Sequence, residues 1–96
     1  MRMMMRARIP VEAGNVGLTN GTLPAALQEV MALVQPEAVY IGTDQGLRCV
    51  TIVFDLKDSS DIPAVTEPFF QKANASVELL PVMNQDDLQA GMAKLG

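Results

Sequence analysis

The residues of this 96-residue chain that could do chemistry begin with two arginines and two carboxylates. Arg6 and Arg8 occupy alternate positions of one predicted strand, so both side chains point to the same face of a sheet. If that strand lies between two others, its arginines reach Asp55 on one side and Glu78 on the other. One hypothesis is a polar pocket in which an arginine binds a ligand carboxylate through two parallel hydrogen bonds. The other is a self-neutralising ion network that allows a dimer to bury the four charges.

Tyrosine, cysteine and threonine side chains near this cluster supply further candidates. Tyr40, the only tyrosine, could donate a hydrogen bond to a ligand or anchor an interface. Cys49, the only cysteine, has no histidine to activate it and is expected to be a buried structural thiol. The sequence assigns a catalytic role to none of these residues. The residues hypothesised to line a ligand pocket are Arg6, Arg8, Tyr40, Arg48, Thr51, Asp55 and Glu78.

The composition excludes several classes of site and partner. With no histidine and one cysteine, the chain cannot form a histidine- or cysteine-based zinc site, a serine–histidine triad or an internal disulfide. A net charge of −4, with only one tyrosine and three phenylalanines, disfavours nucleic acid as a partner. No apolar stretch approaches the ~20 residues of a membrane-spanning helix. We therefore expect a cytoplasmic protein with no cofactor and no metal that binds neither nucleic acid nor membrane.

Hydrophobic periodicity predicts the elements that would position these residues. Strands follow from alternation at period two, and helices from apolar residues three and four apart. We expect Thr22 and Asn84 to cap helices, and Pro68 to kink or end the helix that contains it. The predicted elements are a strand over Met3–Val11, a glycine-rich loop over Gly14–Thr22 above the mouth of a cleft, a helix over Leu23–Val34, strands over Ala38–Thr43 and Leu47–Leu56, a helix over Ile62–Ala73, a strand over Ala75–Val82 and a tail helix over Asn84–Leu95.

This order of elements predicts one ferredoxin-like α+β domain over residues 1–96, with residues 84–96 as a C-terminal tail helix. Right-handed crossovers interleave the two strand-helix-strand units into a four-stranded antiparallel sheet, with both helices on one face. Sorted by alternation, the helix-side residues are Met3, Met5, Ala7, Ile9, Val39, Ile41, Val50, Ile52, Phe54, Val77 and Leu79. The opposite face combines Met4, Arg6, Arg8, Tyr40, Cys49, Thr51, Val53, Asp55, Ser76, Glu78 and Leu80.

The opposite face is more apolar than a sheet surface that faces water. The mean hydropathy of the chain is +0.20. After folding, a domain of this length still exposes more than roughly a third of the surface that its unfolded chain exposes. We therefore expect a second copy of the chain to cover this face. The result would be a homodimer with a polar-lined cavity.

The chain resembles the dimeric α/β-barrel superfamily, in which two ferredoxin-like protomers pack sheet to sheet. The segment 62–70 with its following Val77-Glu78, Pro81-Val82-Met83 and Asp86-Asp87-Leu88 is similar to a small, uncharacterised bacterial branch of that superfamily, as is the segment 9–15. The resemblance covers nearly the whole chain. Members include cofactor-independent monooxygenases, isomerases, haem enzymes and regulatory domains. The haem enzymes use a histidine ligand, which this chain lacks.

The function expected from these features is that of a small homodimer binding an apolar or weakly acidic metabolite in a cavity. One alternative is an enzyme of the monooxygenase or isomerase type, in which Asp55 or Glu78 would act as acid or base with a pKa raised by burial. The other is a structural or regulatory assembly module. The sequence leaves all three open, and with them the question whether the protein is an enzyme.

Overall fold

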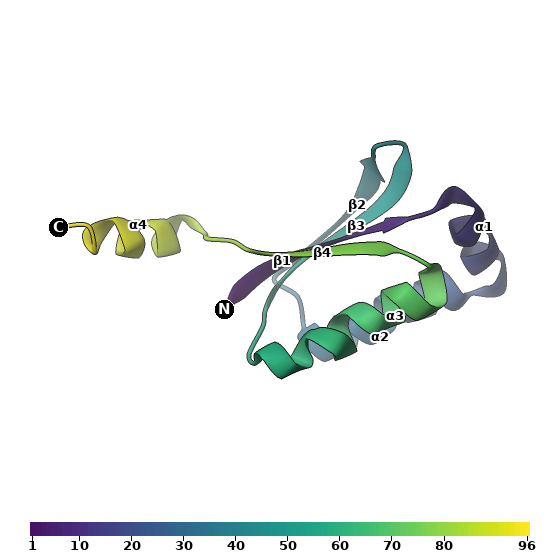
Figure 1. Ribbon diagram of the computed structural model, residues 1–96, viewed down its shortest axis with the longest axis horizontal. Helices are drawn as coiled ribbons and strands as arrows, with labels where there is room; N and C mark the ends of the chain where they lie inside the picture. The colour runs from purple at the N-terminus through teal and green to yellow at the C-terminus, as the bar shows by residue number, and fades with distance from the viewer.

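A four-stranded antiparallel sheet with helices on one face forms the body of the computed structural model, which covers residues 1–96 (Figure 1). The strands lie in the spatial order β2-β3-β1-β4, so β1 is central, as the ferredoxin-like prediction requires. The strands are β1 (Arg2–Ile9), β2 (Ala38–Asp44), β3 (Leu47–Asp55) and β4 (Ser76–Pro81). The helices are α1 (Val11–Asn20), α2 (Thr22–Val34), α3 (Ile62–Ala73) and α4 (Gln85–Ala93), with a short 3-10 turn η1 (Ser59–Asp61) before α3.

The predicted loop over 14–22 is wrong, because most of this segment is helix α1. β1 ends at Ile9, and Pro10 directly precedes the helix, where its fixed φ and missing N–H are tolerated. Two glycines of α1 are buried where the helix comes close to its neighbours. A Cβ added at Gly17 would lie 3.0 Å from the Cβ of Leu23. The glycines therefore allow close packing here, and they do not indicate a mobile loop.

The turns and caps explain where the other elements begin and end. β2 and β3 are joined by Gln45 and Gly46, both with positive φ, which is the backbone of a two-residue type I′ hairpin. Gly21, with a φ of 82°, separates α1 from α2, so Thr22 is the first residue of α2 and not its cap. Instead, the backbone N–H and the hydroxyl of Thr22 both donate to Oδ1 of Asn20. Pro68 lies inside α3, which continues past it.

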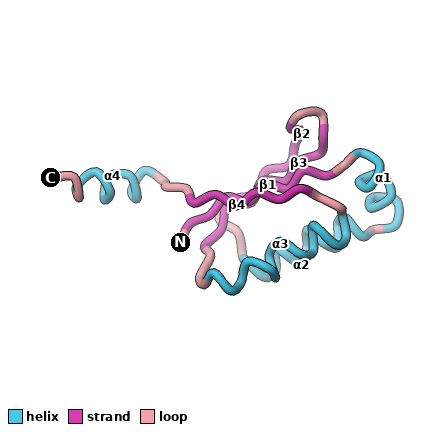
Figure 2. The backbone as a smooth tube through the Cα atoms, in the orientation of Figure 1, coloured by secondary structure: helices cyan, strands magenta, loops and turns pink.

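The core fills the space between the sheet and the two long helices, which lie side by side below it (Figure 2). All the predicted helix-side residues of β1 and β3 are buried, while Val39, Val77 and Leu79 pack against the core and are partly buried. Ile41 departs from the prediction. It pairs with Val50, but its side chain is 67% exposed, because it faces an open groove between the sheet and helices α1 and α2. The largest fully buried side chains are Phe54, Phe69, Met5, Ile9, Ile52, Val30 and Val65.

Helix α4 lies beyond the end of the sheet and makes the molecule 54 Å long, against 28 and 17 Å in the other directions (Figure 1). Asn84 caps it as predicted. The Asn84 side chain accepts a hydrogen bond from the backbone N–H of Asp87, and the Asp87 side chain accepts one from that of Asn84. Neither α4 nor any other helix of the structure combines the length and the apolar character needed to cross a membrane.

Candidate functional site

Five of the seven predicted pocket residues lie together on the sheet face that the helices leave uncovered. The strand register places Tyr40, Thr51, Arg6 and Glu78 in one row across all four strands. Arg8 lies in the next row, between Cys49 and Ser76. A shallow hollow of about 180 Å³ lies over the β2 side of these rows. It is lined by Arg6, Tyr40, Ile41, Gly42, Thr43, Cys49 and Thr51.

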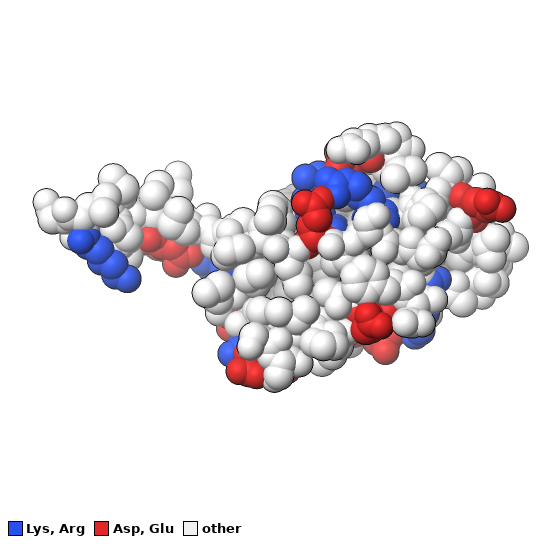
Figure 3. Space-filling view, in the orientation of Figure 1, with Lys and Arg blue, Asp and Glu red and all other residues white.

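Arg6 and Arg8 are both paired with carboxylates, but one partner differs from the predicted one. Arg8 Nε donates to Oδ2 of Asp44 over 2.5 Å, and Arg8 Nη1 donates to Glu78 Oε1. Arg6 Nη2 lies 3.3 Å from the same oxygen of Asp44. The hydrogen bonds that Arg8 donates, first to Glu78 and then to Asp44, raise the pKa of Arg8 further above its already high value. Two positive and two negative groups thus meet near the turn of the β2–β3 hairpin, where Figure 3 shows blue and red side chains in contact.

Asp55 does not join this cluster, which corrects the predicted constellation. The register pairs Asp55 with Arg2 and places Thr51 opposite Arg6, so the carboxylate lies toward the start of β1. Asp44 takes its place, since β2 continues to this residue and does not end at Thr43. The sequence contained the information needed to include Asp44. It is four residues after Tyr40, so alternation along the strand puts both side chains on the same face.

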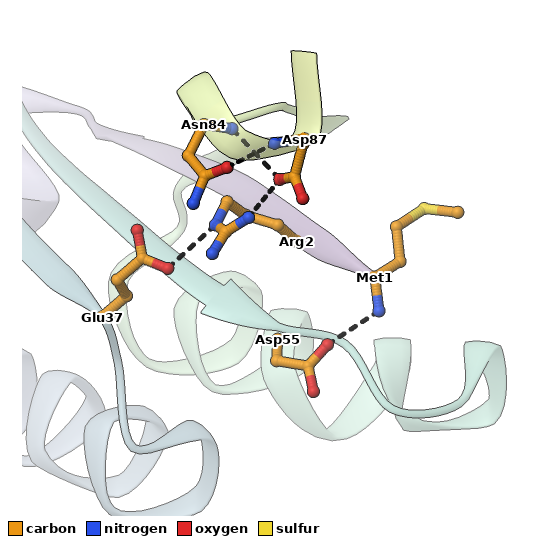
Figure 4. A network of polar contacts seen from close by, with 6 residues as sticks. All are labelled: Met1, Arg2, Glu37, Asp55, Asn84 and Asp87. Carbon is orange, nitrogen blue, oxygen red and sulfur yellow. Dashed lines mark hydrogen bonds and ion pairs between the residues drawn. The ribbon is translucent and has the colours of Figure 1, made fainter. Parts of the chain in front are cut away.

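At the start of β1, Asp55 and Arg2 belong to a separate network (Figure 4). The amino group of Met1 donates to Oδ1 of Asp55 over 2.7 Å, and this hydrogen bond is the main cause that lowers the pKa of Asp55. Arg2 bridges Glu37, 2.8 Å from its Nε, and Asp87 at the root of α4. The positive amino group of Met1 thus shifts the pKa of Asp55 in the direction opposite to the raised pKa expected for an acid–base carboxyl.

The seventh predicted residue, Arg48, lies elsewhere, beside an apolar groove between the sheet and the first two helices. The groove has a volume of about 380 Å³, within the range of small-molecule sites, and Arg48 is the only charged residue in its lining. The full lining is Ile9, Leu18, Leu23, Pro24, Leu27, Ile41, Gly42, Arg48 and Val50. Leu18 comes from the segment predicted to be a loop, which is why sequence reasoning missed this wall of the groove.

The Arg48 guanidinium is held by neutral groups and contacts no carboxylate. Its Nη2 donates to Asn15 Oδ1 over 2.9 Å, and its Nη1 donates weakly to the carbonyl of Val11 over 3.4 Å. Gly14 leaves the space for this guanidinium, because a Cβ there would clash with Nη1 and approach Cγ2 of Ile9 to 3.2 Å. Helix α1 thus positions a positive charge at the groove without neutralising it.

Cys49 is buried and unpaired with another cysteine, as expected of a structural thiol. It lies between Gly42 and Arg8 on the uncovered face. No three aspartate, glutamate or cysteine side chains are grouped in a way that could hold a metal ion.

Comparison with known proteins supports the fold alone. No protein-family model matches the chain, and no curated protein matches it. Among solved structures, it is similar to Rv0793 from Mycobacterium tuberculosis, with a TM-score of 0.53 and 11% identity over 88% of this chain and 96% of that one. It is also similar to the de novo designed protein Ferredog-Diesel, with a TM-score of 0.51 and 10% identity over 84% of this chain and 85% of that one. The chain has a ferredoxin-like fold.

Proposed function

We propose that this protein binds a small apolar acid in the groove between α1, α2 and the sheet, and that Arg48 receives the carboxylate. The observation that carries the proposal is that Arg48 is the only charge in an otherwise apolar lining and has no acidic partner. An apolar cavity with one well-placed polar group is the usual design of a small-molecule site. A guanidinium recognises a carboxylate through paired hydrogen bonds.

The other arginines support the choice of Arg48 by contrast. Arg6 and Arg8 share Asp44, and Arg8 also has Glu78, so an incoming carboxylate would have to displace a partner already in place. Arg2 is occupied in the same way by Glu37 and Asp87. The ion pairs make the Arg6 and Arg8 cluster a neutral patch, which a covering subunit could bury at less cost than four unpaired charges.

The proposal includes a homodimer of the dimeric α/β-barrel type, from the small bacterial branch that the chain resembles, acting in the cytoplasm. The uncovered sheet face supports the dimer, because Tyr40 is 68% exposed and Leu80 is 41% exposed on it. Side chains of this kind are typical of interface cores. The ferredoxin-like fold shared with Rv0793 is compatible with this architecture.

Binding of octanoate and of 1-octanol, compared by isothermal titration calorimetry, tests the proposal. The two probes have the same chain length and differ in charge, so the groove should bind octanoate about 10- to 100-fold more tightly, the range of a charge-assisted hydrogen bond. The R48Q variant should lose this preference and still bind octanol. K57Q, which removes an exposed cation outside the groove, should retain it. Equal octanoate affinity in R48Q and the unmodified protein would overturn the assignment.

A further inference from the structure

Two adjacent residues of helix α1, Gly14 and Asn15, both contact or make room for the guanidinium of Arg48. Gly14 leaves the space in which Nη1 lies, since a Cβ at this position would clash with that atom. The side chain of Asn15 accepts a hydrogen bond from Nη2 over 2.9 Å. Arg48 belongs to β3, so α1 and the sheet meet at this side chain. One turn of α1 therefore determines where the guanidinium lies.

Both residues are poor choices for the interior of a helix. Glycine and asparagine disfavour helical structure compared with alanine, glycine through backbone freedom and asparagine through competing hydrogen bonds of its side chain. Where neighbouring residues weaken the structure in which they lie, another requirement has outweighed local stability. At Gly14 and Asn15 the shared contact is Arg48, which indicates that the requirement is the placement of this one charge.

The amide of Asn15 holds the guanidinium without adding a charge of its own. A guanidinium only donates hydrogen bonds, so the atom of Asn15 that faces it is the oxygen. Aspartate has nearly the same shape and accepts the same hydrogen bond more strongly. The other three arginines, Arg2, Arg6 and Arg8, do have carboxylates as partners. At position 15 the difference between the amide and a carboxylate is thus a difference of charge.

We infer that Asn15 is a positioning residue that makes the groove selective for anions, because it holds Arg48 in place and leaves its positive charge to the ligand. The inference rests on the proposed function and adds the residue that determines the charge of the ligand. Asn15 does not line the groove itself, so it acts through Arg48. A carboxylate at this position would pair with Arg48 and make the groove one for uncharged ligands.

Calorimetry with octanoate and 1-octanol on the N15D variant of the full chain, in 0.15 M salt, tests the inference. N15D should bind octanoate about tenfold more weakly, the size of a charge interaction near a protein surface, and should bind octanol unchanged. N15A, which removes the hydrogen bond and adds no charge, should fall between N15D and the unmodified protein. The matched control is N20D, which makes the same change on the same helix outside the groove lining. The Asn20 oxygen accepts from Thr22, as a carboxylate would, so N20D should keep its preference for octanoate.

The carboxyl group that N15D introduces provides a second measurement, which a purely structural role of Asn15 would not affect. Its pKa, followed by ¹³C NMR, should lie below the ordinary aspartate value of about 3.9, because Arg48 stabilises the charged form. An ordinary pKa would overturn the inference, since the carboxylate would then not pair with Arg48.

The binding data separate the role of Asn15 from the proposed function. Unchanged octanoate affinity in N15D, or an equal loss of octanoate and octanol, overturns the role of Asn15. If R48Q has lost its preference for octanoate in the same experiment, the groove and its arginine still stand. If R48Q keeps that preference, the proposed function fails and the role of Asn15 fails with it.

Discussion

At the scale of single residues, an arginine's neighbours decide what it is able to bind. Arg8 is held by Asp44 and Glu78, while Arg48 donates to an amide oxygen and a backbone carbonyl. The first arrangement neutralises the charge and the second leaves it available to an anion. Sequence alone ranked these residues equally, because charge partners depend on register. Arg48 is two residues before Val50 in the third strand, so alternation puts its side chain on the face that the helices cover.

Gly14 provides a test of how the Arg48 guanidinium is positioned. In G14A the new Cβ would clash with Nη1 of Arg48, and because this atom ends a flexible side chain, the guanidinium should move while the fold is retained. Alanine is favoured over glycine within a helix by about 0.5–1 kcal/mol, which offsets part of the crowding near Ile9. We expect octanoate to lose much of its advantage over octanol in calorimetry. G91A, where the Cβ would meet nothing within 4 Å, is the control and should keep that advantage.

A double variant separates displacement of Arg48 from damage to the groove. If Gly14 acts through Arg48, G14A should change octanoate affinity little in a protein that already carries R48Q. Additive losses in the double variant would instead show that the extra methyl group disturbs the apolar lining directly.

At the scale of elements, periodicity predicted every strand and both long helices, and it failed at α1. Two glycines within this helix weaken the local helical signal, since each costs about 1 kcal/mol relative to alanine. Tertiary contacts outweigh this cost, because Gly14 and Gly17 allow close approach to Arg48 and Leu23. These contacts between distant segments cannot be recognised in the sequence, so neither α1 nor its residue Leu18 in the groove lining was predicted. The caps were easier to predict where the side chain acts locally, as at Asn84.

The turn before α3 predicts a pH dependence of stability. Asp58 accepts hydrogen bonds from the hydroxyl and the backbone N–H of Ser60, which lower the pKa of its carboxyl. Because the folded-state pKa lies below the unfolded value of about 4, the stabilisation is complete above that pH. It is lost as the pH falls through the folded-state pKa. Chemical denaturation should therefore show D58A to be less stable than the unmodified protein at pH 7, with a smaller difference near pH 3. A difference that does not vary with pH would contradict a contribution from the carboxylate charge.

At the scale of the whole molecule, the two faces of the sheet have different origins in the sequence. The helix-side face follows from alternation alone, and it was predicted correctly except at Ile41, which faces the open groove between the sheet and helices α1 and α2. Alternation also identified the residues of the uncovered face, but it could not assign their ion pairs. Strand β2 extends to Asp44, next to the turn, and this carboxylate pairs with Arg6 and Arg8. The position of α4 could not be predicted either, because its orientation depends on a contact with the other end of the sequence, at Arg2.

The uncovered face predicts how the dimer can be broken. Tyr40 lies in the row with Thr51 and Arg6, and its side chain is 68% exposed in the protomer. Y40E would place a carboxylate from the edge strand β2 in a sheet-to-sheet interface, where burial of an unpaired charge is strongly unfavourable. Native mass spectrometry should show a dimer for the unmodified protein and a monomer for Y40E. L33E, which adds the same charge at an exposed apolar position on α2, should remain dimeric. If L33E dissociates and Y40E does not, the subunits associate through the helix layer, and the sheet face is not the interface.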